Sequence, residues 1–484
     1  MFSAMAKKEG HTVELIHAST LFRDGLTREF KPLSRLFNTD KEAFNELKHF
    51  QPDVIAFSVL TYHYKLAIYY AEHCKRICPN AKIIFGGIHV SVVPELVIAN
   101  EFIDYVVIGE GDVAFPEIIK RIEEGNFPDP IVNTWFKAKN KTIIKSKQAG
   151  FIQDLDSPND VELYLKLNPP TTVYYPTMTS RGCPYNCSYC FNHFFRNIPE
   201  EKSNYIRHQS VEHVIEELTT NKNRLKFKTI EFWDDIFTLD KKWLKEFLEA
   251  YKKEVSLPFK CYIHVDLFDE ETAIMLKDAG CKWADFGIQT VNEEYRKKYL
   301  NRHGTNANII KTLKLLKKYK IVSFADYIVG LPGDTIENFE EARFFFLENM
   351  PDIIEPYWMQ YHPKTEIIEK AVELNILDNE KINLINLGYN NYNYYESCFG
   401  AQDFHNQYYF MLKVLPSLPV FLRKKLTYKV SQKIPYFIKI LIYIYSIVYS
   451  TFKHDNLRVK FGAAAYPSEM FRILKLKYFS KKRF

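Results

Sequence analysis

Cysteine is scarce in this chain, and its spacing argues against a protein held together by disulfides. Among 484 residues there are eight cysteines, of which five are scattered: Cys74, Cys78, Cys261, Cys281 and Cys398. Secreted disulfide frameworks have paired, closely spaced cysteines, so this pattern predicts a reducing, cytoplasmic setting. The first ten residues also lack the apolar stretch of a secretory signal peptide. The sequence therefore predicts a protein that is not secreted.

Long apolar runs are absent as well. The most apolar segment covers residues 434–452, and its longest charge-free part, Ile440–Phe452, has 13 residues. A helix needs about 20 apolar residues to cross a bilayer, so we expect this segment not to cross one.

Acidic residues are nearly missing from the end of the chain. From Met411 to Phe484 there are 16 Lys and Arg against two acids, which gives +14 there and leaves −8 elsewhere, because the whole chain carries +6. A basic, tyrosine-rich segment predicts either a helix lying on anionic lipid at the inner membrane face or a buried helix of a capping subdomain. Binding to RNA phosphates is a further alternative, and no DNA partner is expected.

The composition fits a folded chain of two or three domains, with 46% hydrophobic and 15% aromatic residues. Turn-rich and Pro-containing stretches predict boundaries near residues 128, 172 and 375. The four parts would be an α/β domain (1–128), a hairpin and linker (129–172), a second α/β domain (173–375) and a mainly helical, basic, aromatic region (376–484).

The first part alternates short β-branched runs with segments of helical length, which is typical of a doubly wound, flavodoxin-like (Rossmann-type) parallel sheet. The expected strands are Thr12–His17, Val54–Val59, Lys82–Phe85 and Tyr105–Ile108, and the expected helices are Tyr62–Cys78, Pro94–Asn100 and Ala114–Glu124. Glycines follow two of these strands, at Gly86-Gly87 and at Gly109 and Gly111, where a backbone can approach a bulky ligand. Tight turns without a ligand are the alternative.

The same alternation resumes after a hairpin at Ile131–Lys147. Six strands are expected, at Val173–Thr179, Lys228–Trp233, Lys260–Val265, Trp283–Gln289, Ser323–Val329 and Tyr357–Tyr361, with helices between them. Six parallel strands with outer helices predict a partial (β/α)6 barrel, whose sites gather at the carboxyl ends of the strands.

Three cysteines follow the first of these six strands. Cys183, Cys187 and Cys190 have C-x3-C-x2-C spacing. Iron–sulfur clusters and zinc are both held by closely spaced thiolates, and a set of three leaves one metal position open for a substrate or cofactor. A zinc knuckle completed by His193 is the alternative. Cys74 and Cys78, one helical turn apart in an amphipathic stretch, are expected to be small buried apolar residues instead.

With its flanking residues, this triplet resembles that of the radical S-adenosylmethionine (radical SAM) superfamily. The resemblance implies a [4Fe-4S] cluster held by Cys183, Cys187 and Cys190, with the fourth iron left for the methionyl group of S-adenosylmethionine. Reductive cleavage of that cofactor releases a 5′-deoxyadenosyl radical, which abstracts hydrogen from a substrate. The resemblance assigns no catalytic side chain beyond the cluster, and it places Tyr189 beside the adenine.

Further short sequence motifs in the chain resemble the cofactor-binding motifs of the same superfamily. By this resemblance Asp234 or Asp235 binds the methionyl amine, Gln289 and Thr290 lie beside the cofactor, and the Gly-Leu-Pro-Gly turn packs the adenine. That turn has Gly330 and Gly333 as its two glycines.

The segments around Gly86-Gly87 and Gly109–Gly111 resemble the cobalamin-binding domain that precedes many radical SAM domains, and they imply cobalamin as a third cofactor. Two departures stand out. The family's domain opens with a strand ahead of the helix that here begins at Met1, so we expect the sheet to be incomplete at its start. No Asp-x-His-x-x-Gly occurs, so no histidine is expected as the lower cobalt ligand.

The resemblance as a whole implies an enzyme for cobalamin-linked methyl transfer, or for ring formation or rearrangement like that of the anaerobic magnesium-protoporphyrin ester cyclase. It implies a small or lipid-like substrate and an external one-electron reductant such as ferredoxin or flavodoxin. An RNA-modifying radical enzyme and an iron–sulfur protein without radical catalysis are the alternatives.

Overall fold

A computed structural model describes residues 1–18, 31–125, 130–138, 140–157, 174–201, 203–389 and 398–457, together with positions 160, 163, 459, 460, 470 and 473. The chain divides into two compact units. Unit 1 comprises residues 1–167, 185–205 and 360–395, and unit 2 comprises residues 168–184, 206–359 and 396–484. Each unit has its own sheet, and the two are described separately below.

Unit 1 is built on a five-stranded sheet in the order β1-β2-β3-β4-β5. Its first three strands are parallel: β1 (Val54–Ser58), β2 (Lys82–Gly86) and β3 (Tyr105–Val107). The predicted hairpin is present as β4 (Thr134–Lys137) and β5 (Ile143–Lys145), and β4 pairs antiparallel with β3. The hairpin therefore extends the first sheet. The four-part division at residues 128, 172 and 375 remains a prediction.

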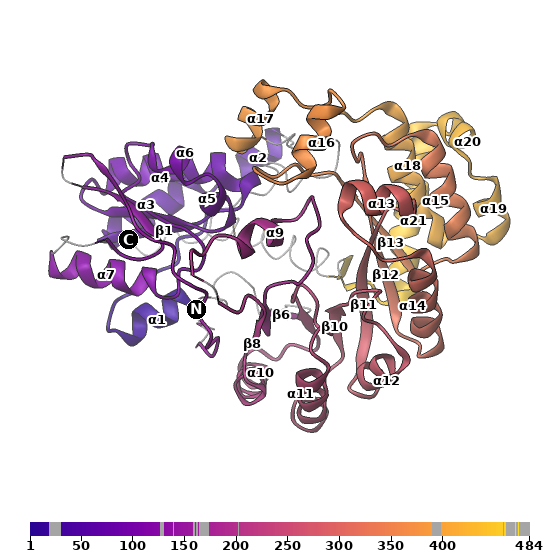
Figure 1. Ribbon diagram of the computed structural model, residues 1–484, viewed down its shortest axis with the longest axis horizontal. Helices are drawn as coiled ribbons and strands as arrows, with labels where there is room; N and C mark the ends of the chain where they lie inside the picture. Colours follow the sequence, from indigo (N-terminus) through magenta and orange to yellow (C-terminus); the bar gives the residue numbers. More distant parts are fainter. Residues whose placement is uncertain are drawn as a thin grey trace. The chain divides into compact units, whose positions relative to one another are not determined.

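Helices cover both faces of this sheet. One apolar core joins the strands to α3 (Asp40–Phe50), α4 (Tyr64–Ile77), α5 (Ile88–Val92) and α6 (Pro94–Ile98), and another joins them to α7 (Ala114–Glu124). In Figure 1, α3, α4 and α6 accordingly lie on the opposite side of β1 from α7. Helices on both faces are the doubly wound arrangement that the alternating pattern predicted.

The expected strand at Thr12–His17 was wrong. These residues follow α1 (Phe2–Lys8) but are outside the sheet, in which β1 is the terminal strand. A β-branched run becomes a strand only when a neighbouring strand supplies hydrogen-bond partners. Here, within the described part of the chain, no strand pairs with it.

Unit 2 contains a six-stranded, wholly parallel sheet in the order β13-β12-β11-β10-β9-β6. The strands are β6 (Tyr175–Thr177), β9 (Ile230–Phe232), β10 (Phe259–Tyr262), β11 (Cys281–Gln289), β12 (Val322–Val329) and β13 (Ile353–Trp358). The strands of this sheet lie side by side in the order in which they occur along the chain, which is the topology of a partial barrel. The six predicted strands are thereby confirmed, although β13 lies four residues earlier than expected.

The helices between these strands begin at side-chain caps. Ser210 caps α10 (Val211–Leu225), Asp240 caps α11 (Lys241–Glu254), Asp269 caps α12 (Glu270–Asp278), Thr305 caps α14 (Asn306–Lys318) and Thr335 caps α15 (Ile336–Glu348). Each cap oxygen accepts a hydrogen bond from a backbone N–H of the first turn, which stabilises a helix by about 1 kcal/mol. Figure 1 shows α10, α11, α12 and α14 along one side of the sheet.

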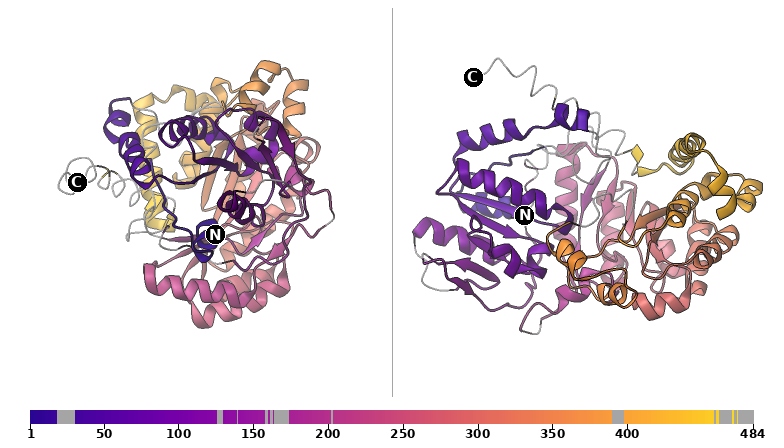
Figure 2. Two further views of the ribbon diagram at one scale, coloured as in Figure 1. Left: turned by 90° about the vertical axis from the view of Figure 1, so that its left-hand side faces the viewer. Right: turned by 90° about the horizontal axis from the view of Figure 1, so that it is seen from above.

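The C-terminal helices of unit 2 follow β13 in the chain; the first of them packs against β13, and the third and fourth pack against the first. They are α18 (Asp403–Val414), α19 (Val420–Lys425), α20 (Tyr428–Lys433) and α21 (Tyr436–His454). Lys413 of α18 forms an ion pair with Glu355 of β13, and the indole N–H of Trp283 donates to the carbonyl of His454 at 2.9 Å. Leu457 joins Trp283, Phe324 and Ile353 in one apolar cluster. Figure 2 shows these helices in yellow beside the strands of unit 2.

Within the described ranges, no helix is long and apolar enough to cross a membrane. This agrees with the expectation that residues 434–452 do not cross a membrane. Most of residues 461–484, which carry part of the predicted basic tail, lie outside the described residues.

Candidate functional site

The three cysteines lie on one loop. Cys183 comes two residues after β7 (Ser180–Arg181), and Cys190 precedes the first residue of α9 (Phe191–Arg196). The Cys190 N–H donates to the carbonyl of Cys187 at 3.0 Å, and all three thiols are free of disulfides. Cys187 is 7% exposed and the other two are partly exposed.

Three thiols within eight residues match the kind of donor that iron–sulfur clusters use, because such clusters are held by cysteine thiolates. Cys183 belongs to unit 2, whereas Cys187 and Cys190 belong to unit 1. Among the described residues, no three His, Cys, Asp or Glu side chains are assembled as a metal site. The fit therefore rests on the chemistry and spacing of the donors.

His193, the predicted zinc ligand of the alternative site, has another partner. Its Nε2 lies 3.1 Å from Glu366 Oε1, and the Ile367 N–H donates to the carbonyl of Ser188 at 3.0 Å. These two contacts join α9 and its preceding loop to the segment after β13. Nothing in this geometry favours a zinc knuckle completed by His193.

Asp234 and Asp235 follow β9 but have different surroundings. Asp234 is 1% exposed, and its carboxylate accepts hydrogen bonds from Thr179 and Ser180. Burial raises the pKa of Asp234, and these hydrogen bonds oppose the rise. Asp235 is exposed. Contact of either residue with the methionyl amine remains a prediction.

The Gly-Leu-Pro-Gly turn follows β12, and its glycines have positive φ, +85° at Gly330 and +81° at Gly333. The Leu331 N–H donates to Asp334 Oδ2 at 2.9 Å, and burial raises the pKa of Asp334 to about 8. A Cβ at Gly330 would lie 2.3 Å from the Sγ of Cys398. The surrounding protein therefore already favours a residue without a side chain at position 330, independently of any contact of Gly330 with the adenine.

Gln289 and Thr290 stand at the end of β11, next to the end of β12. Gln289 has φ +65°, which is uncommon for a residue with a side chain and is often found at functional sites. Thr290 is buried, and its carbonyl accepts from Arg296 at 2.7 Å. Asp234, Gln289 and Gly330 therefore lie at the carboxyl ends of strands of one sheet, where barrel enzymes build their sites. Tyr189 belongs to unit 1 and is partly buried.

The two glycine turns of unit 1 are brought together. Ser91 Oγ donates to the carbonyl of Gly87 at 2.9 Å and accepts from the Gly109 N–H at 2.9 Å. Gly87 has φ +98°, and a Cβ there would lie 2.7 Å from the Val59 nitrogen. The turns therefore share one edge of the sheet at the carboxyl ends of β2 and β3, a place where doubly wound sheets bind ligands.

His89 at this edge was missed from the sequence. It is buried and its Nδ1 lies 3.2 Å from Thr61 Oγ1. Its pKa is lowered to about 4, chiefly by burial and also by the nearby His362, while a hydrogen bond with the Asn386 backbone opposes the shift. A histidine within the apolar run Ile88–Val93 was the available signal.

Cys74 and Cys78 are both buried in the core, and burial raises the pKa of Cys74 to about 12, as expected of inert thiols.

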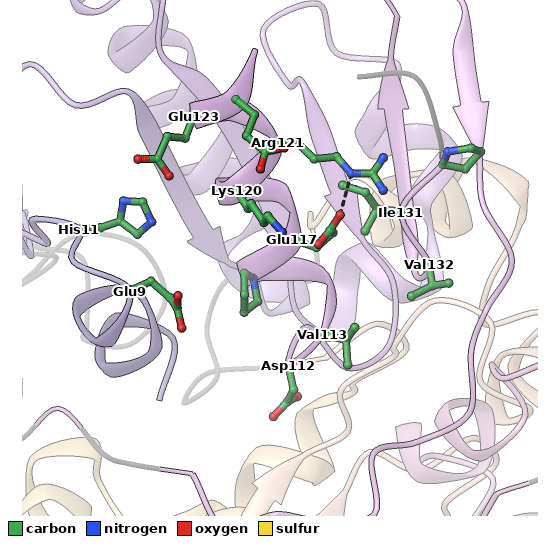
Figure 3. Close-up of a pocket in the computed structure, with 13 residues that line it drawn as sticks. Glu9, His11, Asp112, Val113, Glu117, Lys120, Arg121, Glu123, Ile131 and Val132 are labelled. Atoms are coloured by element: carbon green, nitrogen blue, oxygen red, sulfur yellow. Dashed lines mark hydrogen bonds and ion pairs between the residues drawn. The ribbon is translucent and has the colours of Figure 1, made fainter. Parts of the chain in front are cut away.

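A hollow of about 680 Å³ in unit 1 is separate from all these residues. It is lined by charged groups of α7 and of the segment after α1, among them His11, Lys120 and Glu123 (Figure 3). The Arg121–Glu117 ion pair crosses its wall at 2.8 Å. None of the predicted site residues lines it.

Comparison with known proteins agrees with this arrangement. Residues 177–346 match the Radical SAM superfamily, and residues 1–119 match the B12 binding domain. An uncharacterized methyltransferase of Pyrococcus horikoshii is 28% identical over 382 residues, 78% of each chain. The anaerobic magnesium-protoporphyrin IX monomethyl ester cyclase of Rubrivivax gelatinosus is 23% identical over 76% of this chain and 66% of its own. The solved structure of OxsB, a cobalamin-dependent S-adenosylmethionine radical enzyme, has a TM-score of 0.60 at 16% identity over 91% of this chain and 78% of that one.

A doubly wound domain followed by a six-stranded parallel sheet with a cysteine triplet defines a radical SAM enzyme. This chain carries a radical SAM domain at residues 177–346 and, ahead of it, a B12-binding domain at residues 1–119. The predicted fold class is confirmed. The cofactors that these domains imply are a [4Fe-4S] cluster, S-adenosylmethionine and cobalamin, as predicted.

Proposed function

We propose that this enzyme cleaves S-adenosylmethionine reductively to start hydrogen abstraction and uses the radical for cobalamin-linked methyl transfer. One observation carries the proposal: a cysteine triplet and a pair of glycine turns joined through Ser91 occur in one chain. The relative that it matches over 78% of both chains is called a methyltransferase. Ring formation is the second candidate, supported by the likeness to the cyclase.

We assign the residues as follows. The cluster is bound by Cys183, Cys187 and Cys190. The S-adenosylmethionine contacts come from Tyr189, Gln289, Thr290, Gly330, Gly333 and an acid of the Asp234-Asp235 pair. The cobalamin lies against Gly86, Gly87, Gly109 and Gly111. When bound, the cluster supplies the electron that breaks the sulfonium bond, and an external one-electron reductant such as ferredoxin or flavodoxin reloads it. The substrate is a small or lipid-like molecule.

Anaerobic reconstitution with iron, sulfide and hydroxocobalamin tests this function. We expect bound iron, bound cobalamin, and 5′-deoxyadenosine once S-adenosylmethionine and a reductant are added. A reconstituted chain that binds iron but forms no deoxyadenosine would be an iron–sulfur protein without radical catalysis. A chain that forms deoxyadenosine but takes up no cobalt would contradict methyl transfer through cobalamin.

We also propose that the enzyme works in the cytoplasm and that its C-terminal helices contact anionic lipid. Exposed apolar side chains recur along α21 at helical spacing, so they form one stripe: Tyr436, Phe437, Ile440, Leu441, Ile444, Tyr445, Val448 and Phe452. Phe437 and Leu441 are 64% and 60% exposed. Helix α19, of the same C-terminal region, exposes Val420 and Phe421 and ends in Arg423, Lys424 and Lys425. An apolar stripe flanked by cations suits a negatively charged bilayer surface.

On the other face of α21, Ser446 and His454 are buried, as the alternative of a buried helix expects, whereas contact of the exposed face with lipid stays a proposal. Truncation would remove that packing, so point variants are the better test. With the full chain, sedimentation with vesicles containing anionic phospholipid should fall at least several-fold in Phe437→Gln/Leu441→Gln and at high salt. Phe344→Gln is the control, because Phe344 is 59% exposed on α15. Equal sedimentation of the tail variant and wild type, or sedimentation with neutral vesicles alone, would overturn the proposal, as would binding to RNA but not to vesicles.

A further inference from the structure

The carboxylate of Asp234 is committed to the chain segment that leads into the cysteine loop. Its Oδ1 accepts from the Thr179 N–H at 3.0 Å, from the Thr179 hydroxyl at 2.8 Å and from the Ser180 hydroxyl, and its Oδ2 lies 3.2 Å from the same Thr179 N–H. Asp234 follows β9. Thr179 lies between β6 and β7, and Ser180 is the first residue of β7. One buried side chain therefore fixes two successive residues that are more than fifty positions away in sequence.

Backbone contacts fix the same segment from other sides. The Gln209 N–H donates to the Thr179 carbonyl at 2.8 Å, and the Trp233 N–H donates to the Thr177 carbonyl at 2.8 Å. Ser180 and Arg181 pair with β8 (Arg207–His208). Cys183 stands two residues beyond Arg181, and one residue of extended chain spans about 3.5 Å. The position of Cys183 is thus set by a turn that the Asp234 carboxylate holds.

A carboxylate suits this place better than an amide does. An ionised Asp only accepts hydrogen bonds, and here it meets three donors, whereas an Asn would bring two N–H donors of its own to the same place. When Asp234 is ionised its hydrogen bonds are also roughly twice as strong as neutral ones, and the same bonds oppose the rise in its pKa that burial causes. Asp234 is 1% exposed, so these contacts are shielded from water.

We propose that Asp234 is a positioning residue that holds the Thr179–Ser180 turn so that Cys183 is placed for the cluster. The proposal rests on the proposed function, since it concerns the same cluster and cofactor. It assigns the Asp234 carboxylate to the chain itself, which the sequence Asp234-Asp235 alone does not reveal.

The experiment compares Asp234→Asn and Asp235→Asn with wild type in the full-length, anaerobically reconstituted enzyme. For Asp234→Asn we expect iron loss to a chelator about tenfold faster than in wild type, as one charge-assisted hydrogen bond is worth about that factor. The cluster that remains should still bind S-adenosylmethionine with unchanged affinity and show the wild-type change in its electron paramagnetic resonance spectrum. Asp235→Asn removes a neighbouring exposed carboxylate and is the matched control, so it should retain iron like wild type.

Partner variants separate positioning from a general loss of folding. Thr179→Val/Ser180→Ala should accelerate iron loss as Asp234→Asn does, and adding Asp234→Asn to it should have little further effect, because both remove the same contacts. Thermal melting should show that each variant remains folded at the assay temperature. Unchanged iron retention with weakened cofactor binding in Asp234→Asn would overturn the proposal, and so would a full additive effect in the triple variant. Failure of wild type to hold a cluster at all would instead contradict the proposed function.

Discussion

Replacing Gly330 by Ala should destabilise unit 2 through one identifiable atom. The added Cβ would lie 2.3 Å from the Sγ of Cys398, whereas the Cβ of Cys398 is 4.0 Å away, an ordinary contact. Overpacking of this kind costs about 1–3 kcal/mol. The φ of +85° adds about 1–2 kcal/mol for any residue with a side chain. The expected loss in the free energy of unfolding is therefore about 2–5 kcal/mol.

A second substitution separates the two contributions. Cys398→Ala removes the Sγ, so Gly330→Ala/Cys398→Ala should recover the overpacking part, about 1–3 kcal/mol, and keep the φ part. Thermal melting of the four proteins gives the coupling, and 1 kcal/mol corresponds to about 2–4 °C for a unit of this size. If the double variant melts as low as Gly330→Ala, contact with Cys398 is not what excludes a side chain.

The same pair tests the predicted role in cofactor binding. Weakened binding of S-adenosylmethionine in a Gly330→Val variant alone would have two explanations. The new side chain could displace the adenine directly, or it could distort the turn by colliding with Cys398. In the Cys398→Ala background, affinity for S-adenosylmethionine should still fall when Gly330 is replaced by Ala, if the turn packs the adenine. Wild-type affinity in that background would mean that the turn is structural only.

Three further outcomes are expected. The pKa of Asp334 is raised to about 8 in the folded protein, against about 4 in the unfolded chain, so between these pH values the folded state binds more protons. The free energy of unfolding should therefore fall as pH rises from 4 to 8. The melting temperature of Asp334→Asn should lack this fall. Replacing Cys183, Cys187 or Cys190 by Ala should abolish both bound iron and deoxyadenosine formation, and deoxyadenosine from any one of them would contradict its assignment. Bound cobalamin should have the absorption spectrum of a form without histidine as lower ligand, because the chain has no Asp-x-His-x-x-Gly; a histidine-ligated spectrum would contradict this.

Local patterns predicted most of the fold because the strands of unit 2 are short apolar runs and most of its helices have one apolar face, and both signals lie within each element. The cysteine spacing likewise needs no tertiary information. By contrast, the contact of Asp234 with Thr179 joins residues 55 apart, and that of Cys398 with Gly330 joins residues 68 apart. A contact between residues so far apart leaves no periodic signal in the sequence. The sequence therefore could not distinguish Asp234 from Asp235, and it explained the glycine at position 330 by contact with the adenine. Thr12–His17 failed for the complementary reason, since its pattern is that of a strand but its pairing depends on a neighbour.

The packing of the C-terminal helices on β13 has a consequence for how the protein is made. β13 ends at Trp358, but its covering helix α18 begins only at Asp403, and Leu457, which completes the cluster around Trp283, comes later still. At about 5–20 residues per second, a ribosome needs several seconds to supply this cover. During that interval the terminal strand of the nascent sheet has its unpaired edge open to other chains. Expression at lower temperature or with abundant chaperones should therefore raise the yield of folded enzyme more than it does for a sheet whose edges are closed as soon as they are synthesised.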